Sequence, residues 1–172
     1  MLKIAGVILC TIGCAGYGFS KITGWKKELE EINLWILVFQ KIKSRILYQR
    51  EPLGEICLQM EEEGLGVCGK MTGRVGRLST QKRSVEFADI WRSEIKNMEK
   101  ESFLSGKKKE LLYKFPDYVG SQDLELQENL FSFYMEEWIL EKKKLEVLIQ
   151  EKQKPVMAVS FIGGLIISIL LI

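Results

Sequence analysis

Residues 156–172, "VMAVSFIGGLIISILLI", contain no charged side chain, and this stretch decides how the rest of the chain is interpreted. As an α-helix these 17 residues would extend about 25 Å, slightly less than the roughly 30 Å hydrocarbon core of a bilayer. A helix with one face in water would carry polar residues along that face. Pro155 and the lysines before it would mark the boundary with water. The stretch therefore predicts a transmembrane helix over residues 155–172.

A second apolar run, residues 4–19, stands behind the single Lys3. It predicts another transmembrane helix, over residues 1–20, and two alternatives stay open. A cleaved signal peptide would need a small-x-small site before a polar mature start, which this sequence lacks. The stretch Thr11-Ile12-Gly13-Cys14 resembles a lipid-attachment box, and a lipoprotein would hold the rest of the chain outside the cell.

The lysines beside the two runs predict the orientation, because basic residues are enriched on the cytoplasmic side of transmembrane helices. Three lysines follow the first run and one precedes it: Lys21, Lys26 and Lys27 against Lys3. Five lysines precede the second run and no basic residue follows it: Lys142, Lys143, Lys144, Lys152 and Lys154. Both comparisons predict a membrane hairpin with a cytosolic domain over residues 21–154.

Small residues recur every four positions in both runs, which places each set on one face of a helix. The sets are Gly6, Cys10, Cys14 and Gly18 in the first run, and Ser160, Gly164 and Ser168 in the second. Small faces let helices approach closely in lipid, and small residues are also simply common in membrane helices. The stripes are therefore candidates for packing on each other, on a second copy or on a partner's membrane helix.

The composition excludes several functions. The net charge is only +2 and basic residues alternate with acidic ones, which argues against a nucleic-acid partner. The chain has no histidine, which removes the commonest general base and the commonest metal ligand. The four cysteines form no C-x-x-C pair: Cys10, Cys14, Cys57 and Cys68. We therefore expect free thiols, no metal, no cofactor and no enzymatic activity.

Apolar residues recur every three or four positions through the middle of the chain, which predicts helices. The first is expected over Trp25–Gln49, and Pro52 would end it and open the next. Ser84 and Ser105 are predicted N-caps, and a last helix is expected over residues 121–153. The expected inward positions are Leu29, Ile32, Ile36, Phe39, Ile42, Ile46, Leu53, Ile56, Cys57, Met60, Phe87, Trp91, Ile95, Met98, Leu111, Leu112, Phe115, Val119, Leu130, Tyr134, Trp138, Leu145 and Leu148. The prediction is an all-α antiparallel bundle of five or six helices, flanked by a transmembrane helix at each terminus.

The glycine-rich segment 64–77, "GLGVCGKMTGRVGR", matches parts of two nucleotide-binding motifs. Both motifs need a buried strand directly before them, whereas three glutamates precede Gly64 here. A P-loop also needs Ser or Thr after its lysine, and Met71 occupies that place. The segment is therefore interpreted as a mobile connector or as a helix weakened by glycine.

Three motifs occur together between the apolar runs: Ile46-Leu47-Tyr48-x-x-x-Pro52-Leu53-x-Glu55, then Trp91 in "FADIW", then Gly120-Ser121-Gln122-Asp123-x-x-x-Gln127. With the two apolar ends, they resemble the stage III sporulation protein AB family of endospore-forming bacteria over the whole chain. The chain departs from the family pattern at Arg45, where an acidic residue is usual, and at Glu51, where Thr is usual.

The resemblance implies a helical domain similar to the cytoplasmic domains of the platform protein of type II secretion and type IV pilus machines. It implies a non-enzymatic subunit of a channel-like complex between mother cell and forespore, with its central domain in the mother-cell cytosol. The implied partners are a secretion-type ATPase and the other membrane proteins of the complex. The number of copies in the assembly stays open.

The third motif also has a purely structural interpretation. Gly120 suits the left-handed residue that ends a helix, and Ser121 or Asp123 suits the start of the next. Gln127 lies one turn beyond Asp123, so their side chains can hydrogen-bond. The alternative is that this corner contacts the ATPase or a neighbouring subunit. Trp91 and Trp138 are expected in the core.

Overall fold

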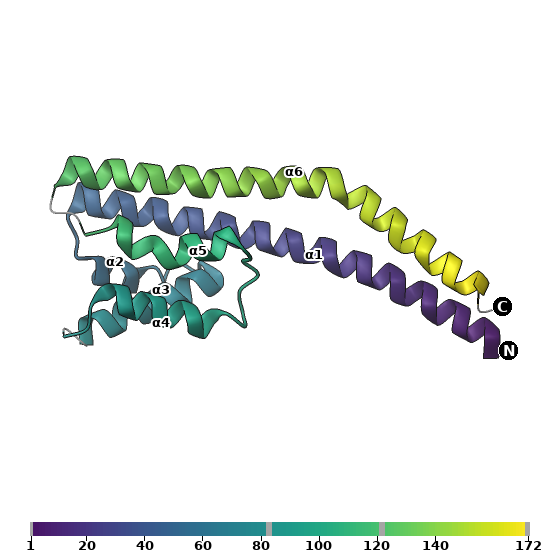
Figure 1. Ribbon diagram of the computed structural model, residues 1–172. Helices are drawn as coiled ribbons and strands as arrows, with labels where there is room; N and C mark the ends of the chain where they lie inside the picture. The colour runs from purple at the N-terminus through teal and green to yellow at the C-terminus, as the bar shows by residue number, and fades with distance from the viewer. Residues whose placement is uncertain (1, 82–83, 121–122, 171–172) are drawn as a thin grey trace. The chain divides into compact units, whose positions relative to one another are not determined.

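The computed structural model describes residues 2–81, 84–120 and 123–170, apart from the side chains of residues 2–5, 7–11, 165 and 167–170. All regular structure in these residues is helical, and the described residues contain no strand. The elements follow one another as α1 (Leu2–Ser44), a π-helical turn η1 (Arg45–Gln49), α2 (Leu53–Gln59), α3 (Gly66–Gln81), α4 (Phe87–Met98), α5 (Lys107–Lys114), a 3₁₀ turn η2 (Phe115–Tyr118) and α6 (Leu124–Leu170) (Figure 1). The all-α prediction is confirmed.

The chain divides into two compact units. Glu30–Lys142 forms one, which we call the head; Met1–Leu29 and Lys143–Ile172 form the other, which we call the hairpin. The boundaries expected from the sequence, at residues 20 and 155, mark the ends of the proposed membrane segments and not the ends of packed units. They fall inside α1 and α6. Within the part of the chain that is described, no helix is both long enough and apolar enough to cross a membrane.

The two long helices correct the predicted helix ends. The first helix was expected to begin at Trp25, but α1 begins at Leu2 and continues without a break. The last was expected to end at residue 153, but α6 continues through Pro155 to Leu170. Proline removes one backbone hydrogen bond, and a helix of this length retains its other hydrogen bonds on both sides of that position.

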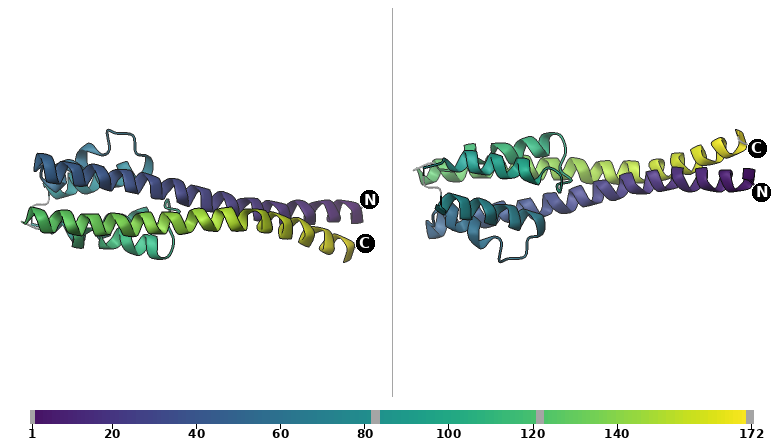
Figure 2. Two further views of the ribbon diagram at one scale, coloured as in Figure 1. Left: turned by 90° about the horizontal axis from the view of Figure 1, so that it is seen from above. Right: turned by 90° about the horizontal axis from the view of Figure 1, so that it is seen from below.

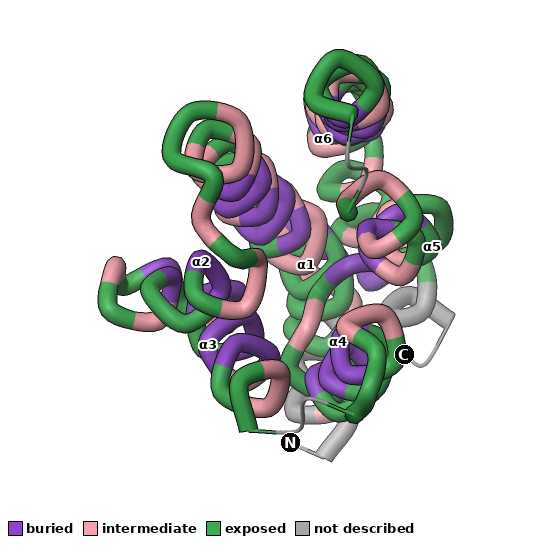
Figure 3. Tube along the Cα trace, turned by 90° about the vertical axis from the view of Figure 1, so that its left-hand side faces the viewer, coloured by how far each residue is buried: buried purple, intermediate pink, exposed green. Residues whose placement is uncertain are grey.

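An aromatic cluster forms the core of the head, and Phe39 of α1 lies at its centre. The Phe39 ring lies 4.8 Å from Phe115, 5.0 Å from Tyr134 and 5.5 Å from Trp138, centroid to centroid. Trp91 of α4 completes the cluster, 4.5 Å from Phe115. The buried positions of the helices face this centre (Figure 3). Stacked and edge-to-face pairs of this kind stabilise a core beyond the area they bury.

The polar tips of two core residues bond to one stretch of backbone in α5. Trp91 donates its ring N–H to the Leu112 carbonyl at 2.8 Å, and Tyr134 donates its hydroxyl to the Leu111 carbonyl at 3.1 Å. A buried polar tip without a partner would be costly, so these bonds orient α4 and α6 against α5. Trp91 and Trp138 are both fully buried, as expected.

The two predicted serine caps are wrong. Helix α4 begins after Glu86, and α5 begins after Gly106, with no side-chain cap in either case. Gly106 has φ +55°, a conformation that glycine adopts without steric cost. The turn geometry at Gly106 thus sets the start of α5.

The glycine-rich segment is a helix, α3, so the glycine-weakened helix was the right alternative and the connector was wrong. Its glycines lie against α2. A methyl group on Gly69 would lie 2.8 Å from the Met60 carbonyl oxygen, and one on Gly76 would lie 2.7 Å from the Cα of Leu58. Helix α2 and a turn precede α3, and no strand does, which excludes the nucleotide-binding interpretation.

Candidate functional site: a groove at the turn end of the head

Three connections gather at one end of the head, which we call the turn end: residues 45–52, residues 84–86 and residues 115–120 (Figures 1 and 2). Residues 30 and 142, where the chain leaves the head, lie at the other ends of their helical stretches. At 1.5 Å per residue, residue 30 is about 21 Å along α1 from Ser44. The turn end is thus opposite to the end at which the chain leaves the head.

The turn after α1 is held by ion pairs. Arg45 donates to Glu63 at 2.9 Å and lies 3.9 Å from Glu51, and Lys41 also pairs with Glu63. Arg45 and Glu51, which are two of the expected departures from the family pattern, belong to one network. Arg50 has φ +55°, and this left-handed residue ends the turn. The departures therefore compensate each other in charge and preserve the turn.

This turn presents Tyr48 to solvent, with 82% of the residue exposed. The next residues, Pro52 to Glu55, begin α2, and the Pro52 carbonyl accepts the amides of Glu55 at 2.9 Å and Ile56 at 3.1 Å. The prediction that Pro52 opens a helix is thus confirmed. Pro52 at the cap position needs no N–H of its own.

A groove of about 340 Å³ lies beside this turn. The start of α2, the end of α3 and the start of α4 line it with Pro52, Leu53, Gly54, Glu55, Ser79, Thr80, Val85 and Phe87. Among the described residues of this lining, Glu55 is the one that carries a charge. The Ser79 hydroxyl is buried and has no hydrogen-bond partner among the described residues. The described lining therefore combines apolar side chains with one carboxylate, Glu55, and two hydroxyl residues, Ser79 and Thr80.

Sequence reasoning found one side of this groove and missed the other. Pro52, Leu53 and Glu55 were motif residues, whereas Ser79, Val85 and Phe87 were not expected beside them. They lie roughly 25 to 35 positions further along the chain, and no local pattern indicates that pairing. The exposed Val85 was the one available signal, because it precedes a predicted helix without joining its apolar stripe.

The corner at residues 118–127 is built by two side chains. Asp123 accepts the amide of Glu125 at 2.9 Å and that of Leu126 at 3.4 Å, the pattern of an N-cap for α6. The buried Gln127 accepts the Gly120 amide at 2.9 Å and donates to the Tyr118 carbonyl at 2.8 Å. Gly120 has φ +99°, and Ser121 lies outside the described residues.

These bonds favour the structural interpretation of the corner. The Gln127 side chain bonds to the backbone on the other side of the turn. The expected bond between the Gln127 and Asp123 side chains stays a prediction. The side chains of Asp123 and Gln127 thus bond to main-chain groups, and these bonds hold the turn from which α6 begins.

Among the described residues of the hairpin, Gly18 of one small-residue stripe lies against Ser160 of the other. Gly18 is buried, and a methyl group added to it would lie 2.8 Å from the Ser160 Cβ and 3.5 Å from the Val156 carbonyl oxygen. Gly164 is also buried, while Gly6 and Cys14 are half-buried and a methyl group on Gly6 would meet open space. The side chains of Cys10 and Ser168 lie outside the described residues.

The thiols of the head are inert. Burial raises the pKa of Cys57 to about 12. Burial, reinforced by the negative charge of Glu31, raises the pKa of Cys68 still further above its usual range. Both stay protonated at neutral pH, whereas nucleophiles and metal ligands need the thiolate. Within the described residues no cluster of three acidic or thiol side chains could hold a metal ion.

Comparison with known families decides the identity. The family model for stage III sporulation protein AB matches residues 3–172, which is nearly the whole chain. The chain belongs to the stage III sporulation protein AB family. No curated protein and no solved structure shows a significant similarity to it.

The family match indicates the general role of the protein. A stage III sporulation protein AB has a role in sporulation, and the family is one of structural and assembly proteins. The match includes both apolar runs as well as the head, so the end segments belong to the family's pattern and are not additions to it.

Proposed function

We propose that the protein is a non-enzymatic platform subunit of a secretion-like channel complex between mother cell and forespore. The apolar runs at residues 4–19 and 156–172 anchor it as a membrane hairpin, and the lysines beside them hold the head in the mother-cell cytosol. The head docks a secretion-type ATPase, and the hairpin packs with the other membrane proteins of the complex.

The observation that carries this proposal is the groove at the turn end. Apolar side chains line most of it, and the turn that precedes it in the chain carries the exposed Tyr48. Contiguous exposed apolar surface often marks an interaction site, and tyrosine is enriched among the residues that dominate protein contacts.

Docking is tested by pulldown of the full-length protein from sporulating cells after chemical crosslinking, with partners identified by mass. Tyr48→Ala and Leu53→Glu are expected to lose the ATPase while retaining the thermal stability of the wild type. Ile139→Glu is the matched control, because Ile139 is an exposed apolar residue of α6 away from the groove. Equal ATPase recovery from all the variants would contradict docking at the groove.

Orientation needs a separate reporter, because Cys57 and Cys68 are buried and would resist thiol reagents on either side of the membrane. Tyr48→Cys places an exposed thiol on the head. We expect a membrane-impermeant reagent to leave it unlabelled in intact cells and to label it after lysis, with the wild-type chain as background. Labelling in intact cells would favour the exported lipoprotein or adaptor instead.

A further inference from the structure

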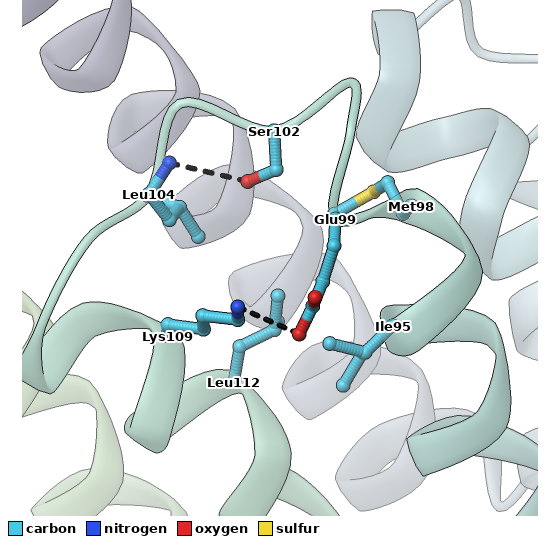
Figure 4. Close-up of a pocket in the computed structure, with 7 residues that line it drawn as sticks. All are labelled: Ile95, Met98, Glu99, Ser102, Leu104, Lys109 and Leu112. Carbon is cyan, nitrogen blue, oxygen red and sulfur yellow. Dashed lines mark hydrogen bonds and ion pairs between the residues drawn. The ribbon is translucent and has the colours of Figure 1, made fainter.

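The enclosed space between α4 and α5 is too small to bind a ligand. It measures about 20 Å³, which is room for about one water molecule, and Met98, Leu104 and Leu112 are among the residues that line it (Figure 4). Glu99 and Lys109, which also line it, pair with each other at 2.6 Å. A partner of the head therefore needs an open surface.

An apolar seam follows one face of α6. Leu126, Phe133 and Leu140 are about half exposed, at 50%, 55% and 45%. They are seven residues apart, close to two helical turns, so they lie one above another on the same face. The Phe133 ring stacks on Tyr118 of η2 with 6.4 Å between the ring centroids, which orients it. We call these three residues of α6 the seam, and none of them is among the described residues that line the groove.

Neighbouring helices contact α6 on both sides of the seam and leave it uncovered. On one side, Lys43 of α1 donates to the Ser132 hydroxyl at 2.8 Å. On the other side, Lys107 of α5 pairs with Glu137. Helical spacing places Ser132 and Glu137 on opposite flanks of Phe133. The head thus holds α6 in place through these flanks while the seam itself stays exposed.

The surface beside the seam is acidic. Glu136 lies three residues after Phe133 and four before Leu140, which places it next to both on the helix surface. Glu125 lies eleven residues earlier, about three turns, and therefore on the same side. Both glutamates are exposed, and neither carboxylate has a hydrogen-bond or ion-pair partner among the described residues. Residues 124–141 contain five glutamates and no lysine or arginine.

We propose that the seam binds an amphipathic helix of a partner protein, one with an apolar stripe and with lysine or arginine beside that stripe. Apolar residues at seven-residue spacing are what two helices present to each other when they pack side by side. Leu126, Phe133 and Leu140 bury against the apolar stripe of the partner, and Glu125 and Glu136 pair with its cations. Complementary charge of this kind selects the partner and sets the register of the two helices.

The same charges disfavour two other occupants. A second copy that paired in parallel through its own α6 would place Glu136 against Glu136. In an antiparallel pair centred on Phe133, Glu136 would lie opposite Leu130 of the other copy, and residues 124–141 supply no cation in either orientation. An anionic membrane surface would attract lysine and arginine, whereas it would repel these carboxylates.

The test places photoreactive p-benzoylphenylalanine at position 133 of the full-length protein in sporulating cells. The matched control carries it at position 139, because Ile139 is 52% exposed on the same helix but lies outside the seam. The crosslinked segment is sequenced by mass spectrometry. We expect a partner segment with apolar residues seven apart and basic residues beside them, at a yield several-fold above that at position 139.

Four results of this experiment would overturn the proposal. They are an adduct with a second copy, an adduct with lipid, a partner segment without the expected pattern, and a yield at position 133 no higher than at position 139. Recovery of the ATPase from the same cells reports docking at the groove independently. Retained ATPase without the expected adduct at position 133 therefore overturns the seam contact alone.

The role of charge is tested with Glu136→Lys in the photoreactive chain, which should lower the adduct yield several-fold. Glutamate in place of the partner's basic residue should restore it. Glu128→Lys is the matched control: Glu128 is also exposed on α6, but it lies five residues before Phe133 and so faces away from it. Circular dichroism should show both variants folded. Equal yields from the two variants overturn the proposed partner chemistry.

Discussion

Gly76 of α3 lies directly against Leu58 of α2, so closely that a methyl group on Gly76 would be 2.7 Å from the Leu58 Cα. The Gly54 carbonyl oxygen is as close, at 2.7 Å, and Gly73 is similarly close to the Glu61 side chain, 2.6 Å from its Cβ. Glycines of the segment that resembles a phosphate-binding loop, Gly69, Gly73 and Gly76, thus form the face of α3 that packs on α2 and the turn after it.

Gly76→Ala should destabilise the head, because backbone atoms of α2 cannot move aside as a flexible side chain could. We expect a loss of about 1–3 kcal/mol, the usual cost of overpacking. Gly24→Ala is the matched control, because Gly24 is also helical but has nothing within 4 Å of the added methyl. Thermal unfolding of the full chain in mild detergent should show a lower Tm for Gly76→Ala and an unchanged or higher Tm for Gly24→Ala. Equal Tm values would contradict close packing at Gly76.

Glu31→Ala should release the loop at residues 99–106, because it leaves the Phe103 amide and the Ser102 hydroxyl without their acceptor. The expected cost is roughly 2–4 kcal/mol for hydrogen bonds to a buried charge. Hydrogen exchange at Phe103 should accelerate far more than at Asp89, whose amide bonds to Glu86 in α4. Unchanged exchange at Phe103 would show that the loop does not depend on Glu31.

Helical periodicity in the sequence predicted most of the core of the head. Ile32, Phe39 and Ile42 are buried as the spacing indicated, and so are Trp91 and Trp138. Trp35 was not predicted, although it is fully buried. A period of three to four residues marks a single buried face, whereas α1 is covered on more than one side.

The candidate site could be predicted only in part. Pro52 and Leu53 carry a local signal, because proline restricts the backbone wherever it stands. Phe87 and Ser79 join the groove through the packing of α3 and α4, which a single sequence does not reveal. Glu31 was missed for the same reason: a glutamate next to Glu30 resembles a surface residue until the loop at Phe103 covers it.

Asp123→Ala should lower stability by about 1 kcal/mol, because it removes the N-cap of α6 that holds the amides of Glu125 and Leu126. Asp123→Asn should retain most of the stability, since an asparagine oxygen also accepts these bonds. Urea unfolding followed by circular dichroism distinguishes the two variants. Intact stability of Asp123→Ala together with lost ATPase recovery would instead make this corner an interface.

The buried thiols should make the head sensitive to alkali. The Cys57 thiol has a pKa of about 12 in the folded head, against 9.0 for an ordinary cysteine. Above pH 9 the unfolded chain loses this proton while the folded chain keeps it, so the stabilisation is complete below pH 9 and disappears as the pH rises towards 12. Between pH 9 and 10 the loss is about 1 kcal/mol for each such thiol.

This loss can be measured by urea unfolding at several pH values from 8 to about 10.5, a range within which the unfolded thiols ionise. Cys57→Val, which replaces the thiol with an apolar group of similar size, should lower the slope of stability against pH. The same slope in both chains would show that Cys57 ionises in the folded head. The wild-type thiols should also resist maleimide at pH 7 until the head is unfolded.

Gly18→Ala should weaken the hairpin, because the added methyl would lie 2.8 Å from the Ser160 Cβ. Close approach at small residues is what brings two helices together where lipid gives them no hydrophobic drive. Gly16→Ala is the matched control, since nothing lies within 4 Å of its added methyl. In detergent micelles we expect a lower Tm for Gly18→Ala alone, and Ser160→Gly in the same chain should restore it by vacating the space. Failure of Ser160→Gly to rescue Gly18→Ala would show that these two residues do not face each other.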